Sequence, residues 1–326
     1  MQPALFQMEV APEIEDYWPR RLLHVPSMTS YAKAEECRYN GTRRPRYNIL
    51  SYTWGRWEVI DPVIRRSLPV QGVPWKIPTV EETHFTVETF HMVLKQMVQD
   101  DIEWIWVDIA CIDQENSSFK MDEVGKQASI FKNAANTFVW VCHSSSDALT
   151  RSLNVLESRS AESWYSGGKL SAVGLIQDIY DAAKTWFSSL WTLQEIVMRN
   201  DALILSATAE PVTVESRYLL HMIMLINTCM NIHGRLSISP DEGTDPEENG
   251  ESLQQSKTII SNILQLIAQA GFYYTFSTNP NVQYGTAKHR KTRDEVDRVY
   301  AIMQIYNIRV GQSLRPNDRP SVQALI

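Results

Sequence analysis

Cysteine is scarce in this chain of 326 residues, which contains only Cys37, Cys111, Cys142 and Cys229. The four are widely spread and form no CxxC pair, so the sequence provides neither a disulfide framework nor the paired thiolates of a tetrahedral zinc site. Unpaired cysteines are typical of proteins in a reducing compartment. We therefore expect a cytoplasmic protein.

Basic residues are not in excess either. Acidic residues outnumber basic ones by 38 to 31, which gives the chain a formal net charge of −7. A protein of this charge has no general attraction to a polyanion, so nucleic acid is not an expected partner.

Long apolar runs are also missing. The most apolar segment, residues 219–230, is interrupted by His221, Asn227 and Thr228 and is too short to span a bilayer. The first 21 residues contain acids and prolines and lack the basic-then-apolar order of a signal peptide. We expect residues 219–230 to form a core helix, and we expect no membrane partner.

Several catalytic motifs with a known mechanism are absent from the sequence. The seven histidines form no HExxH pair, and there is no GxSxG elbow, no P-loop and no GxGxxG stretch. A metal site is therefore not expected, and the common sequence signatures of hydrolases, NTPases and Rossmann dehydrogenases are lacking.

The hydrophobic residues, 44% of the chain, fall into alternating strand-like and helix-like segments. Short β-prone runs predict strands at residues 46–52, 103–109, 137–142 and 202–206. Apolar spacings of three and four predict helices at residues 85–98, 121–135, 177–184 and 190–197. This alternation predicts an α/β fold with a mainly parallel sheet flanked by helices. We also predict an extra hairpin over residues 68–77, around Gly72 and its flanking prolines.

The pattern divides the chain into three parts. Residues 1–45 are an N-terminal extension, residues 46–210 are the α/β core, and residues 211–326 are a helical C-terminal part. Helices are predicted there at residues 257–270 and 294–306. Between residues 237 and 256 the chain loses its aromatic residues and gathers acids, Gly and Pro, which is typical of a solvated loop.

The first candidate site follows the first predicted strand. In an open parallel sheet, ligands bind beyond the carboxyl ends of the strands, where loops expose backbone amides and side chains. Arginine offers a planar fork of donors to a phosphate, and glycine permits close backbone approach. The candidate residues are Ser51, Tyr52, Trp54, Gly55 and Arg56. The alternative is that Trp54 and Trp57 fill the core and Arg56 is a surface cation.

The second candidate site lies within residues 104–114. Asp108 falls inside an otherwise apolar predicted strand, where an ionised carboxylate is costly unless a partner or an open cleft receives it. A ligand site at the strand end explains this aspartate, and a helix cap explains it equally well. Cys111 has no neighbouring histidine and is not expected to be a nucleophile, because a small buried thiol is the commoner outcome.

The third candidate site is the predicted helix at residues 190–197. Residues three and four apart share a helix face, so Trp191 and Glu195 lie together. A carboxylate beside an aromatic wall suits chemistry at a ribose, since it binds hydroxyls and offsets positive charge at the anomeric carbon. The alternative is an amphipathic helix in which Glu195 faces solvent or pairs with Arg199.

Taken together, these segments resemble the heterokaryon-incompatibility (HET) domain of fungal proteins. Four blocks occur in the order of that family over roughly residues 47–205, namely YNILSYTWG, WIWVDIACIDQ, VGKQASIFKNAANTFVWV and WFSSLWTLQE. A later block, DEVDRVYAIMQIY at residues 294–306, resembles the helix that commonly follows the HET core. The resemblance implies a role in heterokaryon incompatibility, programmed cell death or fungal innate immunity.

HET domains in turn resemble TIR domains, which have a flavodoxin-like fold. Ser51 and Tyr52 resemble the SY that ends the first TIR strand, and Asp108 resembles the acid of its second conserved strand. The hairpin after the first strand and the segment at residues 143–185 exceed a minimal TIR core, so the resemblance does not fix the shape of the pocket.

The stretch SLWTLQE at residues 189–195 resembles the SxWxxxE stretch of NAD-cleaving TIR domains, whose glutamate is catalytic. The counterpart of that glutamate is Glu195, and the cysteine usual after the tryptophan is Thr192 here. The resemblance therefore implies cleavage of NAD or NADP at the nicotinamide-ribose bond, with the dinucleotide as substrate and no further cofactor. It implies a pocket formed by Ser51, Tyr52, Trp54, Gly55, Arg56, Asp108, Cys111, Ile112 and Trp191.

The same resemblance implies self-association that completes the pocket and an upstream recognition protein as partner. Two other functions stay open on the sequence. In the first, the domain is a non-enzymatic signalling module that only assembles. In the second, it is a sensor that binds a nucleotide without cleaving it.

Overall fold

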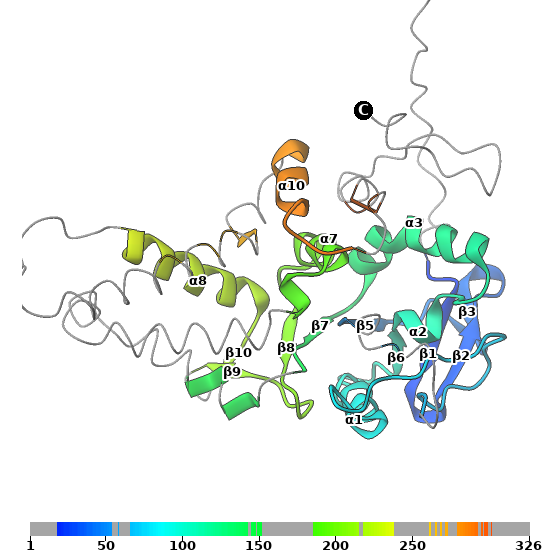
Figure 1. Ribbon diagram of the computed structural model, residues 1–326. Helices are drawn as coiled ribbons and strands as arrows, with labels where there is room; N and C mark the ends of the chain where they lie inside the picture. The colour runs from blue at the N-terminus through cyan, green and yellow to red at the C-terminus, as the bar shows by residue number, and fades with distance from the viewer. Residues whose placement is uncertain are drawn as a thin grey trace, which may run out of the picture.

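The computed structural model describes residues 18–53, 66–142, 185–214, 218–237 and 279–292, together with isolated positions such as Leu149 and Phe272 (Figure 1). Predicted segments at residues 54–57, 177–184, 238–256, 257–270 and 294–306 lie outside the described residues, apart from a few single positions.

The centre of the fold is a six-stranded sheet in the order β2-β1-β6-β5-β7-β8. Its strands are β1 (Arg21–His24), β2 (Thr29–Ala32), β5 (Tyr47–Ser51), β6 (Trp104–Trp106), β7 (Thr137–Trp140) and β8 (Leu203–Leu205). Strands β6, β5, β7 and β8 pair in parallel, whereas β1 pairs antiparallel with β2 and β6. Across the sheet, the neighbouring parallel strands β6, β5, β7 and β8 are the second, first, third and fourth parallel strands along the chain. The winding of the sheet therefore reverses between β5 and β7, which makes this pair the topological switch point.

Helices cover both faces of this sheet. Helix α1 (Val87–Gln96) lies on one side in Figure 1, and α3 (Ser117–Asn133) and α7 (Leu190–Met198) lie on the other. Trp140 of β7 packs against Phe90 of α1, with ring centroids 5.6 Å apart. Trp106 of β6 packs against Phe131 of α3 at 6.1 Å. The central strand β5 is consequently buried at every position, as expected of a parallel strand covered on both sides.

Local sequence explains where two of these helices begin. The Thr86 side chain accepts a hydrogen bond from the backbone N–H of Thr89 at 3.1 Å and caps α1. The Asn116 side chain accepts from the backbone N–H groups of Ser118 and Phe119 and caps α3. Such caps satisfy amides that have no partner inside the helix, and each stabilises its helix by about 1 kcal/mol.

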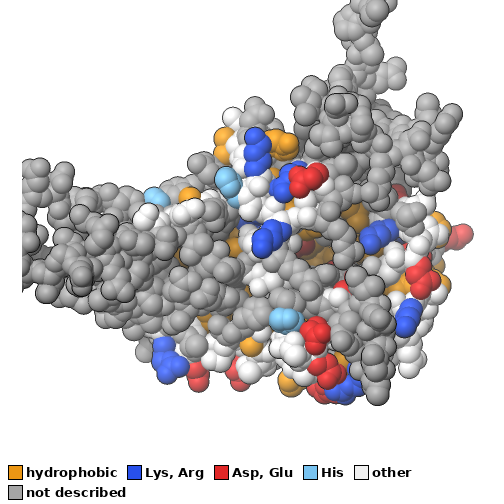
Figure 2. Space-filling model, in the orientation of Figure 1, with side chains coloured by type: hydrophobic (Ala, Val, Ile, Leu, Met, Phe, Trp, Pro, Cys, Tyr) orange, Lys and Arg blue, Asp and Glu red, His pale blue; other side chains and the backbone are white. Residues whose placement is uncertain are grey.

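The remaining elements are short or peripheral to the sheet. They comprise α2 (Asp108–Cys111), α8 (Met222–Ser237), α10 (Pro280–Ala287), the strand pairs β3 (Arg38–Tyr39) with β4 (Thr42–Arg43) and β9 (Thr213–Val214) with β10 (Tyr218–Leu219), and the 3-10 turns η2 (Val25–Ser27) and η3 (Glu35–Cys37). None of the helices among the described residues is long and apolar enough to cross a bilayer. On the face drawn in Figure 2, acidic and basic side chains are interspersed.

The alternation of strands and helices predicted from the sequence is confirmed. The strands expected at residues 46–52, 137–142 and 202–206 are β5, β7 and β8. The helices expected at residues 85–98, 121–135 and 190–197 are α1, α3 and α7, and the expected core helix at residues 219–230 is the start of α8.

Two local predictions are corrected by the structure. The strand expected at residues 103–109 ends at Trp106, and the chain enters α2 at Asp108, so this aspartate does not lie within a strand. The segment 68–77 forms no hairpin of regular strands, and its two ends are joined by an isolated antiparallel bridge between Ser67 and Thr79. It runs beside β2 instead, where the N–H of Ser30 donates to the carbonyl of Gln71 at 2.9 Å. Gly72 turns the chain there with a φ of 76°.

The hairpin that joins the sheet is β1–β2, from residues predicted to be an N-terminal extension. The segment before it is held on α3 by Glu123, which is fully buried. The Glu123 carboxylate accepts from the backbone N–H of Arg20 at 3.1 Å and from the indole N–H of Trp106 at 3.3 Å. Burial raises the pKa of Glu123 to about 7.

Candidate functional site

The candidate site lies at the carboxyl end of β5, next to the switch point of the sheet. Ser51 is the last residue of β5 and pairs in register with Val139 of β7. Its side chain is buried, with 1% of the residue exposed. In open parallel sheets this is where ligands bind, because the neighbouring connections leave in opposite directions and open a crevice.

Ser51 joins a short chain of hydrogen bonds. The indole Nε1–H of Trp186 donates to Ser51 Oγ at 2.7 Å, and the Ser51 hydroxyl donates to Glu195 Oε2. The direction of this chain is set at its first member, since an indole N–H only donates. The fold brings Ser51 and Glu195 together although they are 144 residues apart in the sequence. The hydrogen bond from Ser51 holds one carboxyl oxygen of Glu195 in place.

Helix α7 positions Glu195. The helix begins after Ser189, and Glu195 lies in its second turn on the side that faces β5. Only 8% of Glu195 is exposed, so the alternative in which it faces solvent is wrong. The alternative partner Arg199 forms an ion pair with Asp201 at 2.7 Å and donates to the carbonyl of Ala134 at 2.7 Å.

The environment of Glu195 disfavours its charge. Burial raises the pKa of Glu195 to about 8, and the negative charge of Asp108 adds to this effect. The Ser51 hydrogen bond and the positive charge of Arg290 act in the opposite direction and lower that pKa. Carboxyl groups with a raised pKa and specific charged neighbours are frequent at functional sites.

Asp108 reaches the site from the start of α2, which follows β6. Its Oδ1 accepts the backbone N–H of the next residue, Ile109, at 2.8 Å, whereas the N-cap position of α2 is Val107 and has no side-chain cap. The Asp108 carboxylate also affects Tyr52, the residue that follows β5. Burial and the negative charge of Asp108 raise the pKa of the Tyr52 hydroxyl well above its usual value. Ser51, Tyr52, Asp108 and Glu195 therefore share one region of the molecule.

Two residues of this region were missed from the sequence. Trp186 supplies the indole that binds Ser51, whereas the sequence suggested Trp191. Trp191 is partly buried and packs against the core cluster that contains Trp186 and Leu193. The other missed residue is Arg290, which is 1% exposed and lies 98 residues beyond Thr192, to which it donates.

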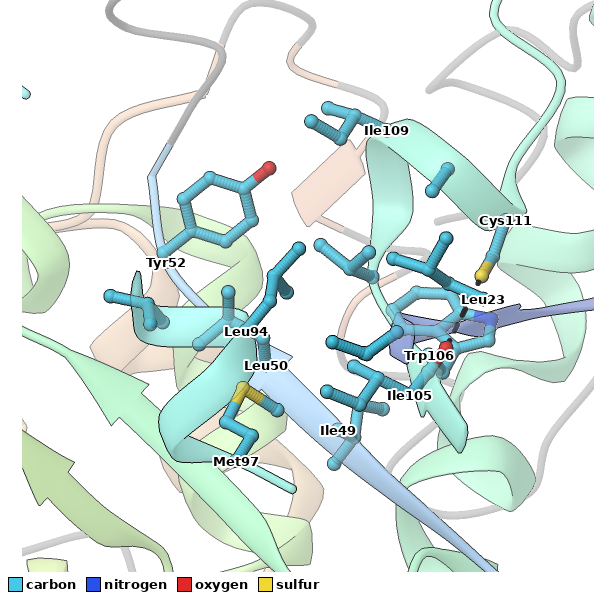
Figure 3. Close-up of a cluster of buried hydrophobic side chains, with 14 of the residues drawn as sticks. Leu23, Ile49, Leu50, Tyr52, Leu94, Met97, Ile105, Trp106, Ile109 and Cys111 are labelled. Carbon is cyan, nitrogen blue, oxygen red and sulfur yellow. Dashed lines mark hydrogen bonds between the residues drawn. The ribbon is translucent and has the colours of Figure 1, made fainter. Parts of the chain in front are cut away.

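Cys111 and Ile112, which the resemblance placed in the pocket, lie in the core. Cys111 is 2% exposed, and its Sγ–H points to the carbonyl of Ile105 at 3.8 Å (Figure 3). Burial raises the pKa of this thiol to about 12, which leaves it protonated at neutral pH. Trp54, Gly55 and Arg56 lie outside the described residues.

No metal site emerges from the part of the chain that the structure describes, in which no group of three His, Cys, Asp or Glu side chains could hold an ion. The fold is thus a mainly parallel α/β domain with a buried carboxylate at its switch point.

Residues 47–195 match the family model described as Heterokaryon incompatibility protein (HET). This match confirms the HET resemblance for the segment that runs from β5 to Glu195. Comparison with curated proteins and with solved structures gave no match. The relationship to TIR domains stays a prediction.

Proposed function

We propose that this protein is a HET-type cell-death effector that hydrolyses NAD or NADP at the nicotinamide-ribose bond, with Glu195 as the catalytic carboxylate. The observation that supports this most is the buried Glu195 held by the Ser51 hydroxyl at the end of β5. The match of residues 47–195 to the HET family supports the cellular role in heterokaryon incompatibility. The expected location is the cytoplasm, where the dinucleotide is available.

The strand order also supports the kinship to TIR domains. A second-first-third-fourth order of parallel strands is the order of flavodoxin-like sheets, which bind their ligands at the switch point between the first and third strands. In this chain those strands are β5 and β7, and Ser51 is at that point. The proposal therefore places the dinucleotide at this end of the sheet, next to the carboxyl group of Glu195.

In the proposed reaction the bond between ribose C1′ and the nicotinamide ring nitrogen breaks, and its electron pair leaves with the nicotinamide. The ring is cationic before cleavage and neutral afterwards, so the leaving group needs little help from an acid. Positive charge develops on the sugar, and the ionised carboxylate of Glu195 stabilises it. Water then adds to C1′ and loses a proton to solvent.

The charges of the site suit the cationic nicotinamide ring of the substrate. Glu195 and Asp108 are two acids, and Arg290 is one base, so the cluster carries a single net negative charge when all three are ionised. A pKa of about 8 leaves Glu195 mostly protonated at neutral pH in the free protein. A bound pyridinium cation lowers that pKa, because an opposite charge favours the ionised form. Substrate binding thus prepares the carboxylate for the reaction.

The test is release of nicotinamide from NAD by the purified protein, followed by chromatography. The Glu195→Gln variant keeps the shape of the side chain and removes its charge, and we expect it to be inactive. Glu123→Gln is the matched control, because Glu123 is also buried, has a raised pKa and lies outside the site. Turnover that persists in Glu195→Gln contradicts the proposal. Binding of intact NAD without turnover by the natural chain identifies a sensor instead.

Self-association is part of the same proposal. If a second copy completes the pocket, the rate per protomer rises with protein concentration, and we expect this in a dilution series. A rate per protomer that is constant over the whole series contradicts it. If the natural chain shows no turnover and the Glu195→Ala variant still kills cells, the protein is a non-enzymatic signalling module.

A further inference from the structure

Arg290 is a buried cation supplied by the chain beyond residues 47–195. It follows α10 and is 1% exposed. Its Nη1 donates to the carbonyl of Ser189 at 3.1 Å and to the Thr192 hydroxyl at 3.0 Å. Both partners belong to the start of α7, the helix that bears Glu195.

The backbone beside Arg290 is fixed to the same helix start. The N–H of Lys291 donates to the carbonyl of Ser188 at 2.6 Å, and the N–H of Leu190 donates to the carbonyl of Lys291 at 3.0 Å. The Arg298 side chain donates to the carbonyl of Arg290 at 2.9 Å. These bonds set the guanidinium group in a defined place against the first turn of α7.

The electrostatics of this position are costly. The first turn of a helix is the positive end of its dipole, so a cation there is unfavourable. Removing a guanidinium group from water adds a further cost, and burial lowers the pKa of Arg290 to about 9. A neutral donor would bind the Ser189 carbonyl and the Thr192 hydroxyl equally well. The charge of Arg290 is therefore of use where it acts on a nearby anion.

That anion is Glu195. Thr192 and Glu195 are three residues apart and share one face of α7, so the guanidinium group on Thr192 faces the turn of Glu195. The negative charge of Glu195 is what opposes the fall in the pKa of Arg290. The groups that act on Glu195 are Ser51 from β5, Asp108 from α2 and Arg290.

Thr192 connects this cation to the rest of the site. Its hydroxyl accepts from Arg290 and lies within hydrogen-bond distance of the Trp186 carbonyl at 2.6 Å. Trp186 in turn binds Ser51, which binds Glu195. In the resembling TIR stretch a cysteine stands at this position, and a thiol is a much weaker acceptor than a hydroxyl.

We infer that Arg290 is a positioning residue for the proposed reaction, which favours the ionised form of Glu195 and orients it through the Thr192 hydroxyl, so that residues beyond the HET match complete the site. The inference rests on the proposed function for its chemistry, and on the contacts of Arg290 for its geometry. The role is one of positioning, because the Arg290 side chain donates to Ser189 and Thr192 at the start of α7.

The test measures the protonation of Glu195 directly, without substrate. Infrared difference spectra of each protein minus its own Glu195→Gln form follow the carboxyl stretch of this residue against pH. We expect Arg290→Met to raise the midpoint by about 1 to 3 pH units, the usual influence of one close opposite charge. Arg290→Lys keeps the charge and should restore most of the natural midpoint.

A second pair of variants covers the case in which Arg290→Met does not fold. Thr192→Val removes the hydroxyl at nearly constant volume and should shift the midpoint in the same direction by less. Thr192→Ser restores the hydroxyl and should restore the midpoint.

The pH profile of nicotinamide release should move with these midpoints. Unchanged midpoints in folded Arg290→Met and Thr192→Val proteins overturn the inference. If the midpoints shift but the natural chain has no turnover, the electrostatic role of Arg290 stands and the proposed function fails.

Discussion

Replacement of Glu195 by glutamine should change how the stability of the protein depends on pH. In the folded protein the pKa of Glu195 is about 8, against an ordinary value of 4.5. A folded-state pKa above the unfolded one means that the native state holds a proton that the unfolded state releases. The contribution of this group to stability is therefore complete below pH 4.5 and is lost as the pH rises through 8.

The size of this effect follows from the difference of about 3.5 pH units. At about 1.4 kcal/mol for each pH unit, ionisation of Glu195 costs the folded state up to about 5 kcal/mol above pH 8. Solvent screens the Glu195 charge little, because only 8% of the residue is exposed, so this free-energy cost is not reduced. Glutamine at this position cannot ionise and can still accept from the Ser51 hydroxyl, so the variant avoids this loss.

The assay is urea unfolding of the natural chain and of Glu195→Gln between pH 5 and pH 8, followed by tryptophan fluorescence. The difference in the free energy of unfolding should grow in favour of the variant by about 3 kcal/mol over this range. Other titrating groups, including Glu123, are common to both proteins and cancel in the difference. A difference that is independent of pH refutes the reasoning, because it would mean that Glu195 titrates normally.

Three further outcomes are expected. Asp108→Asn removes the negative charge that raises the pKa of Glu195, so the pH profile of nicotinamide release should move to lower pH; a profile unmoved or moved upward contradicts this. Ser51→Ala removes the hydrogen bond that lowers the same pKa, so the carboxyl titration should move to higher pH, and an acid shift in the infrared spectra is the opposing result. Glu123→Gln should also gain stability relative to the natural chain as the pH rises. Because the pKa of Glu123 is about 7, this gain in the free energy of unfolding by urea should level off near pH 7. A gain that levels off near pH 8 would contradict the assignment of the two pKa values to Glu123 and Glu195.

The parts of the fold that the sequence predicts are those with strong local patterns. β5, β7 and β8 are runs of apolar residues because parallel strands are buried on both faces, and α1 shows its buried side through Phe90, Val93 and Leu94. β1 gives no such signal. It is four residues long, ends in His24 and is joined to the parallel strands by pairing with β6, which lies far away in the sequence.

The site divides in the same way. A strand end is readable, so Ser51 and Tyr52 were predicted from the position of β5. The meeting of Ser51 with Glu195 depends on α7 packing beside β5, and it came from the resemblance to HET and TIR domains rather than from spacing. Arg290 has no local signal, because a lone arginine in a polar stretch reads as a surface cation. The role proposed for it depends on its tertiary contacts with Ser189 and Thr192 of α7.

Trp191 shows what a helix-face argument leaves open. Residues 191 and 195 do lie on neighbouring turns of α7, but Trp191 packs against the core cluster while Glu195 turns towards β5. The aromatic group that binds Ser51, the hydrogen-bond partner of Glu195, is Trp186, from the turn before the helix. A spacing of four places two residues on one side of a helix, whereas the neighbouring elements decide which group each one meets.

The most direct measurement is the rate of nicotinamide release from NAD by the natural chain and by Glu195→Gln at pH 8.5, where the carboxyl is ionised in the free protein. We predict that the natural chain turns over and that the variant is slower by at least about 100-fold, the scale of losing one group that stabilises a charged transition state. Equal rates in the two proteins would contradict the assignment of Glu195 as the catalytic carboxylate.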